Sequence, residues 1–144
     1  MAASGPLDTA PVDLRAIRRS SSPNDSLSCA PGVCAARADF ASPVYPLSRT
    51  ALLQAAEAIL LAEPRTEIAA RDDALPQVVF VQKSPIFGFA DTIRVQADGS
   101  DGEASLIVHS RSNTGYYDFG VNRKRIRRLL DGLTHRLSGT SPSP

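Results

Sequence analysis

The feature that most constrains the fold of this chain is a series of strand-like segments in its second half. In "DTIRVQA", Ile93 and Val95 alternate with polar residues, which is the period of a strand with one face in a core. "QVVFVQK" is apolar on both faces, as expected of a strand covered on two sides. Short connections such as "DGSDGE" join the segments and favour an antiparallel meander. The four predicted strands are residues 66–71, 77–83, 91–97 and 104–111.

Helical patterns lie on both sides of these strands. Ser48 is a good N-cap for a helix that ends at Pro64, and Asp118 is suited to the start of a helix that runs to residue 137. Each helix carries one apolar stripe. The sequence therefore predicts an α+β fold, in which two helices pack on one face of a four-stranded antiparallel meander sheet.

The domain organisation follows from the prolines. Six of the eleven prolines precede residue 47, so we expect an extended Pro-rich arm before the folded part. We predict a disordered arm over residues 1–20, a single domain over residues 21–137 and a disordered tail over residues 138–144. A chain of 144 residues is sufficient for one such domain.

A polar corner is expected where the last strand meets the last helix. Asn122 lies beside the apolar stripe of the helical wheel, and Arg123 lies at the other edge of the stripe. Polar groups turned toward a core need hydrogen-bond partners. Asp91 opens the neighbouring strand and is a candidate counter-charge for Arg111 or Arg123. The predicted corner consists of Asp91, Ser110, Arg111, Ser112, Asp118, Asn122 and Arg123.

The loop "SPIFGFAD" places Phe87 and Phe89 in a connection between strands, with Gly88 permitting the bend. Two interpretations remain open. The rings either fold over the end of the sheet and complete the core, or form an apolar lip for a ligand or partner beside the arginines of the corner.

Cys29 and Cys34 lie on either side of a Pro-Gly turn. Such a turn can bring two cysteines within disulfide distance, but two free thiols in a loop fit the spacing equally well. With only these thiols and two histidines in the sequence, no metal site is predicted. No motif indicates a cofactor.

The composition narrows the classes of function. Residues 121–137 hold six Lys or Arg and one acidic residue, yet the formal net charge of the whole chain is only +1. A basic stripe on an amphipathic helix is usually its solvated face, which argues against nucleic-acid binding and leaves anionic lipid or an acidic partner as alternatives. Neither G-x-S-x-G nor a phosphate-binding loop is present. His109 could act as a base with Asp91, but a lone strand histidine is more often part of a polar sheet face.

Several stretches resemble one known family. These are "VQKSPIFGFADTIRV", "SRSNTGYYDFGVNRKRI", "PRTEI" and "PND" followed by "CAPGVC". Together they are similar to the bacterial and plastid family numbered 1499 among domains of unknown function, over residues 22–135. The resemblance implies a fold unit without an established activity.

The resemblance also bears on the compartment. Similar proteins often carry a membrane helix or lipoprotein signal before this domain, which suggests the cell envelope and would favour a Cys29–Cys34 disulfide. The first twenty residues here contain no continuous apolar segment, and no run of apolar residues is long enough to span a bilayer. These two features suggest the cytoplasm instead.

We therefore interpret the chain as a non-enzymatic binding or interaction module that binds an anionic or amphipathic ligand or partner at one end of the sheet. One alternative is a small enzyme that uses Asp91, Arg111, Asn122 and Arg123. A second alternative is contact of the basic C-terminal helix with nucleic acid or anionic lipid. The oligomeric state stays open.

Overall fold

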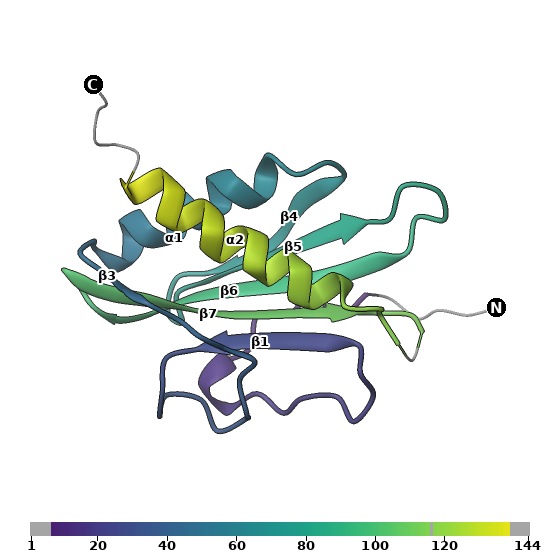
Figure 1. The fold of residues 1–144 in the computed structure, drawn as a ribbon, viewed down its shortest axis with the longest axis horizontal. Helices are drawn as coiled ribbons and strands as arrows, with labels where there is room; N and C mark the ends of the chain where they lie inside the picture. Colours follow the sequence, from purple (N-terminus) through teal and green to yellow (C-terminus); the bar gives the residue numbers. More distant parts are fainter. Residues whose placement is uncertain (1–6, 116, 139–144) are drawn as a thin grey trace.

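The computed structural model describes residues 7–115 and 117–138, which form two helices over one large sheet (Figure 1). None of the described helices is both long and apolar enough to cross a bilayer. The helices and strands are η1 (Leu14–Ala16, a 3-10 helix), β1 (Asp25–Cys29), β2 (Phe40–Ala41), β3 (Val44–Tyr45), α1 (Arg49–Leu61), β4 (Thr66–Asp72), β5 (Gln77–Lys83), β6 (Ala90–Ser100), β7 (Glu103–Ser112) and α2 (Val121–Ser138).

The sheet contains seven strands in the order β2-β1-β7-β6-β5-β4, with β3 also paired to β7. Strands β4 to β7 form the predicted antiparallel meander. The prediction of a four-stranded sheet was wrong, because β1 pairs antiparallel with β7 and β2 adds a parallel pairing to β1. A meander that ended at β7 would leave the backbone N–H and C=O groups of that edge unpaired. The N-terminal part of the chain supplies those partners.

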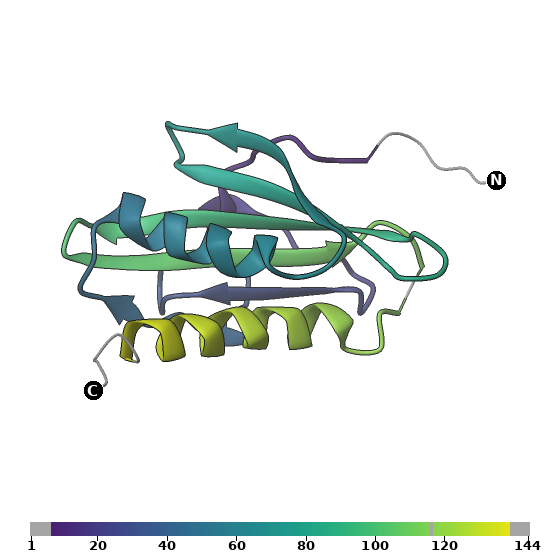
Figure 2. The same ribbon diagram turned by 90° about the horizontal axis from the view of Figure 1, so that it is seen from above.

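Both helices pack on the same face of the sheet (Figure 2). Ile93 and Val95 of β6 point to this face, as their alternation predicts. The N-cap expected at Ser48 is present, since its side chain accepts a hydrogen bond from the N–H of Ala51. The fully buried helical side chains of this core are Leu52, Ala56 and Leu60 of α1 and Ile126, Leu129 and Leu133 of α2.

The N-terminal segment lies across the opposite face of the sheet. The N–H of Val12 donates to Gln77, the N–H of Leu14 donates to Gln96, and Arg94 donates to the carbonyl oxygen of Ala10. Gln77, Arg94 and Gln96 on this face are therefore hydrogen-bonded to backbone groups of the N-terminal segment. The sequence led us to expect a disordered arm over residues 1–20, whereas residues 8–17 contact the sheet. Residues 1–6 and 139–144 lie outside the described part of the chain.

An ionic cluster joins this segment to β1. The carboxylate of Asp25 accepts from Nε2 of His109 at 2.8 Å and from Arg19, which also pairs with Asp39 at 2.9 Å. Burial of Asp25 would raise the pKa of its carboxyl, but the hydrogen bonds from His109 and Arg19 outweigh this effect and hold the pKa below its ordinary value. His109 is thus bound on the face of the sheet away from the helices.

A disulfide links Cys29 and Cys34, whose Cα atoms are 6.2 Å apart. Of the two alternatives left open by the sequence, the structure has the disulfide. The bond anchors the turn after β1 to a small second core, which contains Leu14, Leu27 and Ile107.

Candidate functional site

Arg125 organises a buried polar network at one end of the sheet. Its guanidinium lies 2.8 Å from the carboxylate of Asp91, at the start of β6, and donates to the side-chain oxygen of Gln82 at 2.8 Å. Nη1 donates to Ser110 at 3.0 Å and to Asn122 at 2.6 Å. Only 4% of Arg125 is exposed. A buried guanidinium with this many acceptors has a fixed position and orientation.

Asn122 is the second centre of the network and is completely buried. Its amide nitrogen donates to Ser112, to Asp118 and to the carbonyl oxygen of Asn24, while its amide oxygen accepts from Ser110 at 2.7 Å. Asp118 also accepts from the backbone N–H of Asn122 and of the preceding Gly120, as expected of a carboxylate at a helix N-terminus. The network therefore joins β5, β6, β7 and α2 with Asn24, the residue before β1.

The structure brings together five of the residues that we placed in the polar corner: Asp91, Ser110, Ser112, Asp118 and Asn122. It places the two predicted arginines elsewhere. Arg111 points to the opposite face, 3.8 Å from Asp8, and Arg123 is exposed with its guanidinium 5.0 Å from the ring centre of Phe40. The expected counter-charge relationship of Asp91 with Arg111 or Arg123 was wrong, because Arg125 has that role.

Arg125 was missed, although the sequence carried a signal for it. The residue follows Asn122 by three positions and precedes Leu129 by four, so it lies on the buried stripe of α2. The basic residues around it, such as Lys124 and Arg127, are exposed, and they obscure the one arginine of this run that faces the core.

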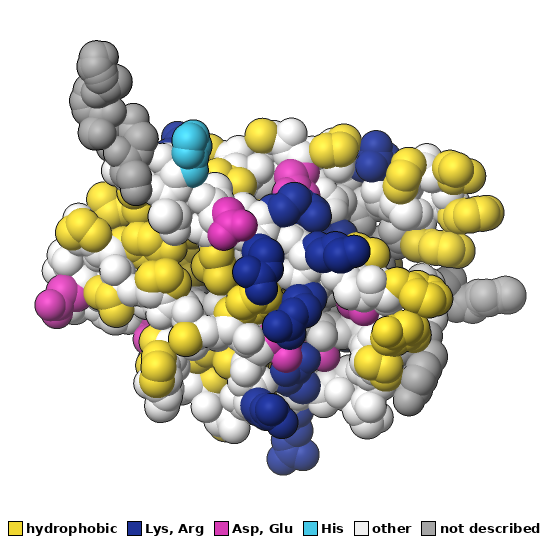
Figure 3. Space-filling model, viewed as in Figure 1, with side chains coloured by type: hydrophobic (Ala, Val, Ile, Leu, Met, Phe, Trp, Pro, Cys, Tyr) yellow, Lys and Arg dark blue, Asp and Glu magenta, His cyan; other side chains and the backbone are white. Residues whose placement is uncertain are grey.

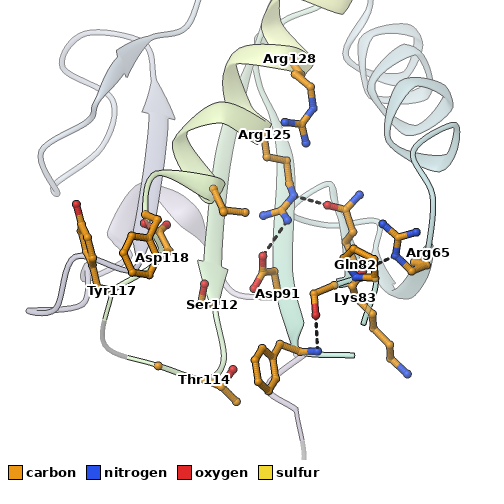
Figure 4. A pocket seen from close by; sticks show the side chains of 16 residues that line it. Arg65, Gln82, Lys83, Asp91, Ser112, Thr114, Tyr117, Asp118, Arg125 and Arg128 are labelled. Atoms are coloured by element: carbon orange, nitrogen blue, oxygen red, sulfur yellow. Dashed lines mark hydrogen bonds and ion pairs between the residues drawn. The ribbon is translucent and has the colours of Figure 1, made fainter. Parts of the chain in front are cut away.

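A cavity of about 570 Å³ opens above the network (Figure 4). Arg125 and Asp91 lie at its base, Arg65 and Lys83 lie on one side, and Tyr117 lies on the other. This volume is in the range of sites that hold small molecules. Its lining residues are Arg65, Gln82, Lys83, Ser84, Pro85, Phe89, Asp91, Ser112, Thr114, Gly115, Tyr117, Asp118, Phe119, Val121, Arg125 and Arg128.

The β5–β6 loop forms one rim of the cavity. The rings of Phe87 and Phe89 stack with their centroids 5.4 Å apart, and both are exposed. The interpretation in which these rings complete the core was therefore wrong. The N–H of Ser84 donates to the carbonyl oxygen of Phe89, and the N–H of Phe89 donates to Oγ of Ser84. Gly88 has a positive φ of 67°, which permits the bend. The loop is thus closed by its own hydrogen bonds with its rings turned outward.

The β7–α2 loop forms the other rim. Tyr117 and Phe119 make a second aromatic pair, with centroids 4.7 Å apart. Phe119 has a φ of 55° and Arg65 has a φ of 57°, and among the described residues these are the only positive values outside glycine. Both residues line the cavity. Left-handed backbone is unfavourable for such side chains and is concentrated at ligand and functional sites in proteins.

The charges around the cavity are unequally compensated. Arg125 is paired with Asp91, and Arg128 is paired with Glu63 at 3.0 Å. Burial would raise the pKa of Glu63, but hydrogen bonds from Arg128 and Gln82 outweigh it and lower that pKa. Arg65 and Lys83 form no ion pair with a carboxylate in the described ranges, and Arg65 donates only to the backbone carbonyl of Lys83.

The sequence was also compared with known proteins. A family described as "Protein of unknown function (DUF1499)" matches residues 14–133, which include the whole cavity lining and the polar network. The chain belongs to this family. No curated protein and no solved structure matches the chain. The family description names no activity, so a role for this DUF1499 domain has to be argued from the geometry of its cavity.

Proposed function

We propose that this DUF1499 domain is a non-enzymatic binding module whose cavity holds an amphipathic anion, a molecule with an apolar body and one anionic group. The observation that carries the proposal is the combination of two exposed aromatic pairs with two uncompensated cations around one cavity. Contiguous exposed apolar side chains around a concave site are a common mark of ligand binding.

Each part of the ligand has a matching part of the site. The apolar body lies between the Phe89 side and the Phe119 side of the cavity, where it covers rings that otherwise face water. The anionic group lies beside Arg65 and Lys83, which have no carboxylate partner among the described residues. Asp91 is already neutralised by Arg125, so the base of the cavity does not repel the ligand strongly.

The two alternatives have less support. The enzyme hypothesis relied on Asp91, Arg111, Asn122 and Arg123 acting together, and Arg111 and Arg123 lie away from the other two. His109, the one base considered, is bound to Asp25 on the other face of the sheet. Of the exposed basic residues of α2, Arg123 pairs with Asp39 and Arg128 pairs with Glu63, which leaves less uncompensated positive charge on the helix.

Isothermal titration calorimetry with decyl phosphate, below the concentration at which it forms micelles, tests the proposal. We expect saturable binding to one site, weaker binding of decanoate and much weaker binding of decanol, which has the same chain and no charge. Binding of all three with equal affinity would show that the cations have no role. Absence of any binding heat with decyl phosphate would contradict the proposal.

Matched variants locate the site. Lys83→Gln removes one cation from the rim, and we expect it to weaken decyl phosphate binding about tenfold, the effect of one charge-assisted hydrogen bond. Arg49→Gln is the control, because Arg49 is similarly exposed but pairs with Asp101 near the β6–β7 turn, at the other end of the sheet. Equal losses in both variants would indicate a nonspecific charge effect.

A further inference from the structure

The exposed apolar side chains of this protein are concentrated at one end. Six of the ten large hydrophobic side chains that are most exposed in the described chain belong to the two loops around the cavity or to the first residue of α2. Ile86 is 84% exposed and Phe119 is 77% exposed. The six are Ile86, Phe87, Phe89, Tyr117, Phe119 and Val121. A soluble surface rarely gathers such side chains unless it contacts an apolar partner.

Basic side chains lie directly behind these loops. Figure 3 shows hydrophobic groups at the end of the molecule where the two loops lie, next to a band of Lys and Arg side chains that crosses α2. Arg65 and Lys83 adjoin the β5–β6 loop, and Lys124 is exposed in the first turn of α2. The two carboxylates of the cavity lining, Asp91 and Asp118, are bound to groups of α2. This end of the protein therefore presents positive charge around an apolar tip.

We propose that this end of the protein docks on an anionic lipid bilayer, with the tips of the β5–β6 and β7–α2 loops inserted at the headgroup level. Aromatic side chains favour the boundary between headgroups and acyl chains, and Lys and Arg behind them are attracted to anionic headgroups. The cavity mouth between the loops then faces the membrane. Docking goes beyond the proposed function, since it requires the loop tips and not a ligand in the cavity.

Two observations favour a bilayer over a nucleic acid or a protein groove. Nucleic-acid bases stack on aromatic rings, but here Phe87 and Phe89 stack on each other and the most exposed side chain is the aliphatic Ile86. The apolar residues are also divided between two loops on opposite rims of a cavity. A divided tip suits a deformable lipid surface, which can close around both loops.

Sedimentation of the full chain with lipid vesicles tests the docking. We expect binding to vesicles of phosphatidylcholine with phosphatidylglycerol, with much weaker binding to phosphatidylcholine alone and a decrease as salt is raised. The double variant Ile86→Ser with Phe87→Ser should weaken binding about tenfold or more, because two exposed side chains lose the apolar surface that would be buried. Lys83→Gln should weaken it about fivefold.

The controls separate docking from other effects. Val44→Ser removes an exposed apolar side chain from β3, which pairs with the other end of β7, and should leave vesicle binding unchanged. A protein that does not sediment with anionic vesicles at low salt overturns the inference, as does equal binding by wild type and the Ile86/Phe87 double variant. Binding of a single-stranded oligonucleotide that this double variant abolishes, without vesicle binding, would overturn it in favour of nucleic acid.

One further variant distinguishes this inference from the proposed function. Thr114→Trp places a bulky side chain in the cavity at an exposed loop position. We expect it to prevent decyl phosphate binding and to retain vesicle binding. Loss of vesicle binding in this variant, with its melting temperature unchanged, would contradict docking through the loop tips alone. Failure of wild type to bind decyl phosphate while it binds vesicles would overturn only the proposed function.

Discussion

The guanidinium of Arg125 lies 2.8 Å from the carboxylate of Asp91, a residue 34 positions earlier in the chain. This pair connects the first turns of α2 to the start of β6, below the cavity. Both side chains are largely buried, so each charge depends on the other for compensation. The pair therefore fixes the base of the cavity, while Arg65 and Lys83 at the rim have no carboxylate partner among the described residues.

Removal of one member of this pair should destabilise the fold strongly. Arg125→Met leaves Asp91 buried without a counter-charge, and we expect a loss of about 3 to 5 kcal/mol in the free energy of unfolding. The double variant Arg125→Met with Asp91→Leu should recover much of this loss, because no buried charge remains. Urea denaturation of wild type, both single variants and the double variant measures the coupling. If the loss in the double variant equalled the sum of the losses in the two single variants, Arg125 and Asp91 would not be coupled and the account would be contradicted.

Arg123→Met is the control for that cycle. Arg123 lies on the same helix two positions earlier, but it is exposed and contacts Asp39 only at 3.8 Å. We expect its free energy of unfolding to differ from that of wild type by about 0.5 kcal/mol or less, as for other surface substitutions.

Asn122→Ala should also destabilise the protein. Asn122 is completely buried and its side chain contacts Ser110, Ser112, Asp118 and Arg125. Loss of the amide leaves buried partners without hydrogen bonds, and each such group lowers the free energy of unfolding by about 1 to 3 kcal/mol. Lys124→Ala, an exposed change in the same turn, should have little effect on thermal unfolding. A melting temperature of Asn122→Ala equal to that of wild type would mean that the corner does not hold the fold together.

The disulfide should contribute a modest stabilisation. Cys29 and Cys34 are separated by only five positions, and closing so short a loop restricts the unfolded chain by about 2 kcal/mol. Thermal unfolding with and without a reductant measures the effect. The double variant Cys29→Ser with Cys34→Ser should resemble the reduced protein and should not respond to the reductant. A wild-type melting temperature that is indifferent to reduction would contradict the prediction.

The Asp25 cluster predicts a dependence of stability on pH. Because His109 and Arg19 lower the pKa of Asp25 in the folded state, the unfolded chain binds more protons in acid and the contribution of Asp25 is lost as the pH falls. The contribution is complete above about pH 5 and decreases below the ordinary carboxyl pKa of about 4. The stability difference between wild type and Asp25→Asn should therefore narrow from about pH 5 to about pH 3. If the free energies of unfolding of wild type and Asp25→Asn changed in parallel over this pH range, the lowered pKa of Asp25 would be contradicted.

The sequence was sufficient for the elements with strong periodicity. Strands β4 to β7 follow from alternation or from a continuous apolar run, both helices follow from apolar stripes, and the roles of Ser48 and Asp118 follow from capping. Strands β2 and β3 have two residues each, and β1 is rich in serine, so their composition carries little strand signal. Strands β1 and β3 pair with the edge of β7, and β2 pairs with β1. The contacts of the N-terminal segment are made mostly through backbone atoms, which no side-chain pattern encodes.

The candidate site was predictable only where it depends on the order of the strands in the meander. Residues at strand ends, such as Asp91 and Ser112, could be placed near one another from the meander alone. The choice among neighbouring arginines required the rotation of α2 about its axis, because Arg123 and Arg125 are only about half a helical turn apart and yet one is exposed and the other buried. The exposure of Phe87 and Phe89 depends on how the loop closes on itself through Ser84.

The most direct test of the central claim is an NMR titration of the ¹⁵N-labelled protein with decyl phosphate. We expect saturable shifts that are confined to the amides of Arg65 and of residues 82–91, 112–115 and 117–128, which surround the cavity. Amides of β2, β3 and the C-terminal half of α2 should not move. Shifts centred on any other surface, or no shifts at a concentration of decyl phosphate just below micelle formation, would contradict it.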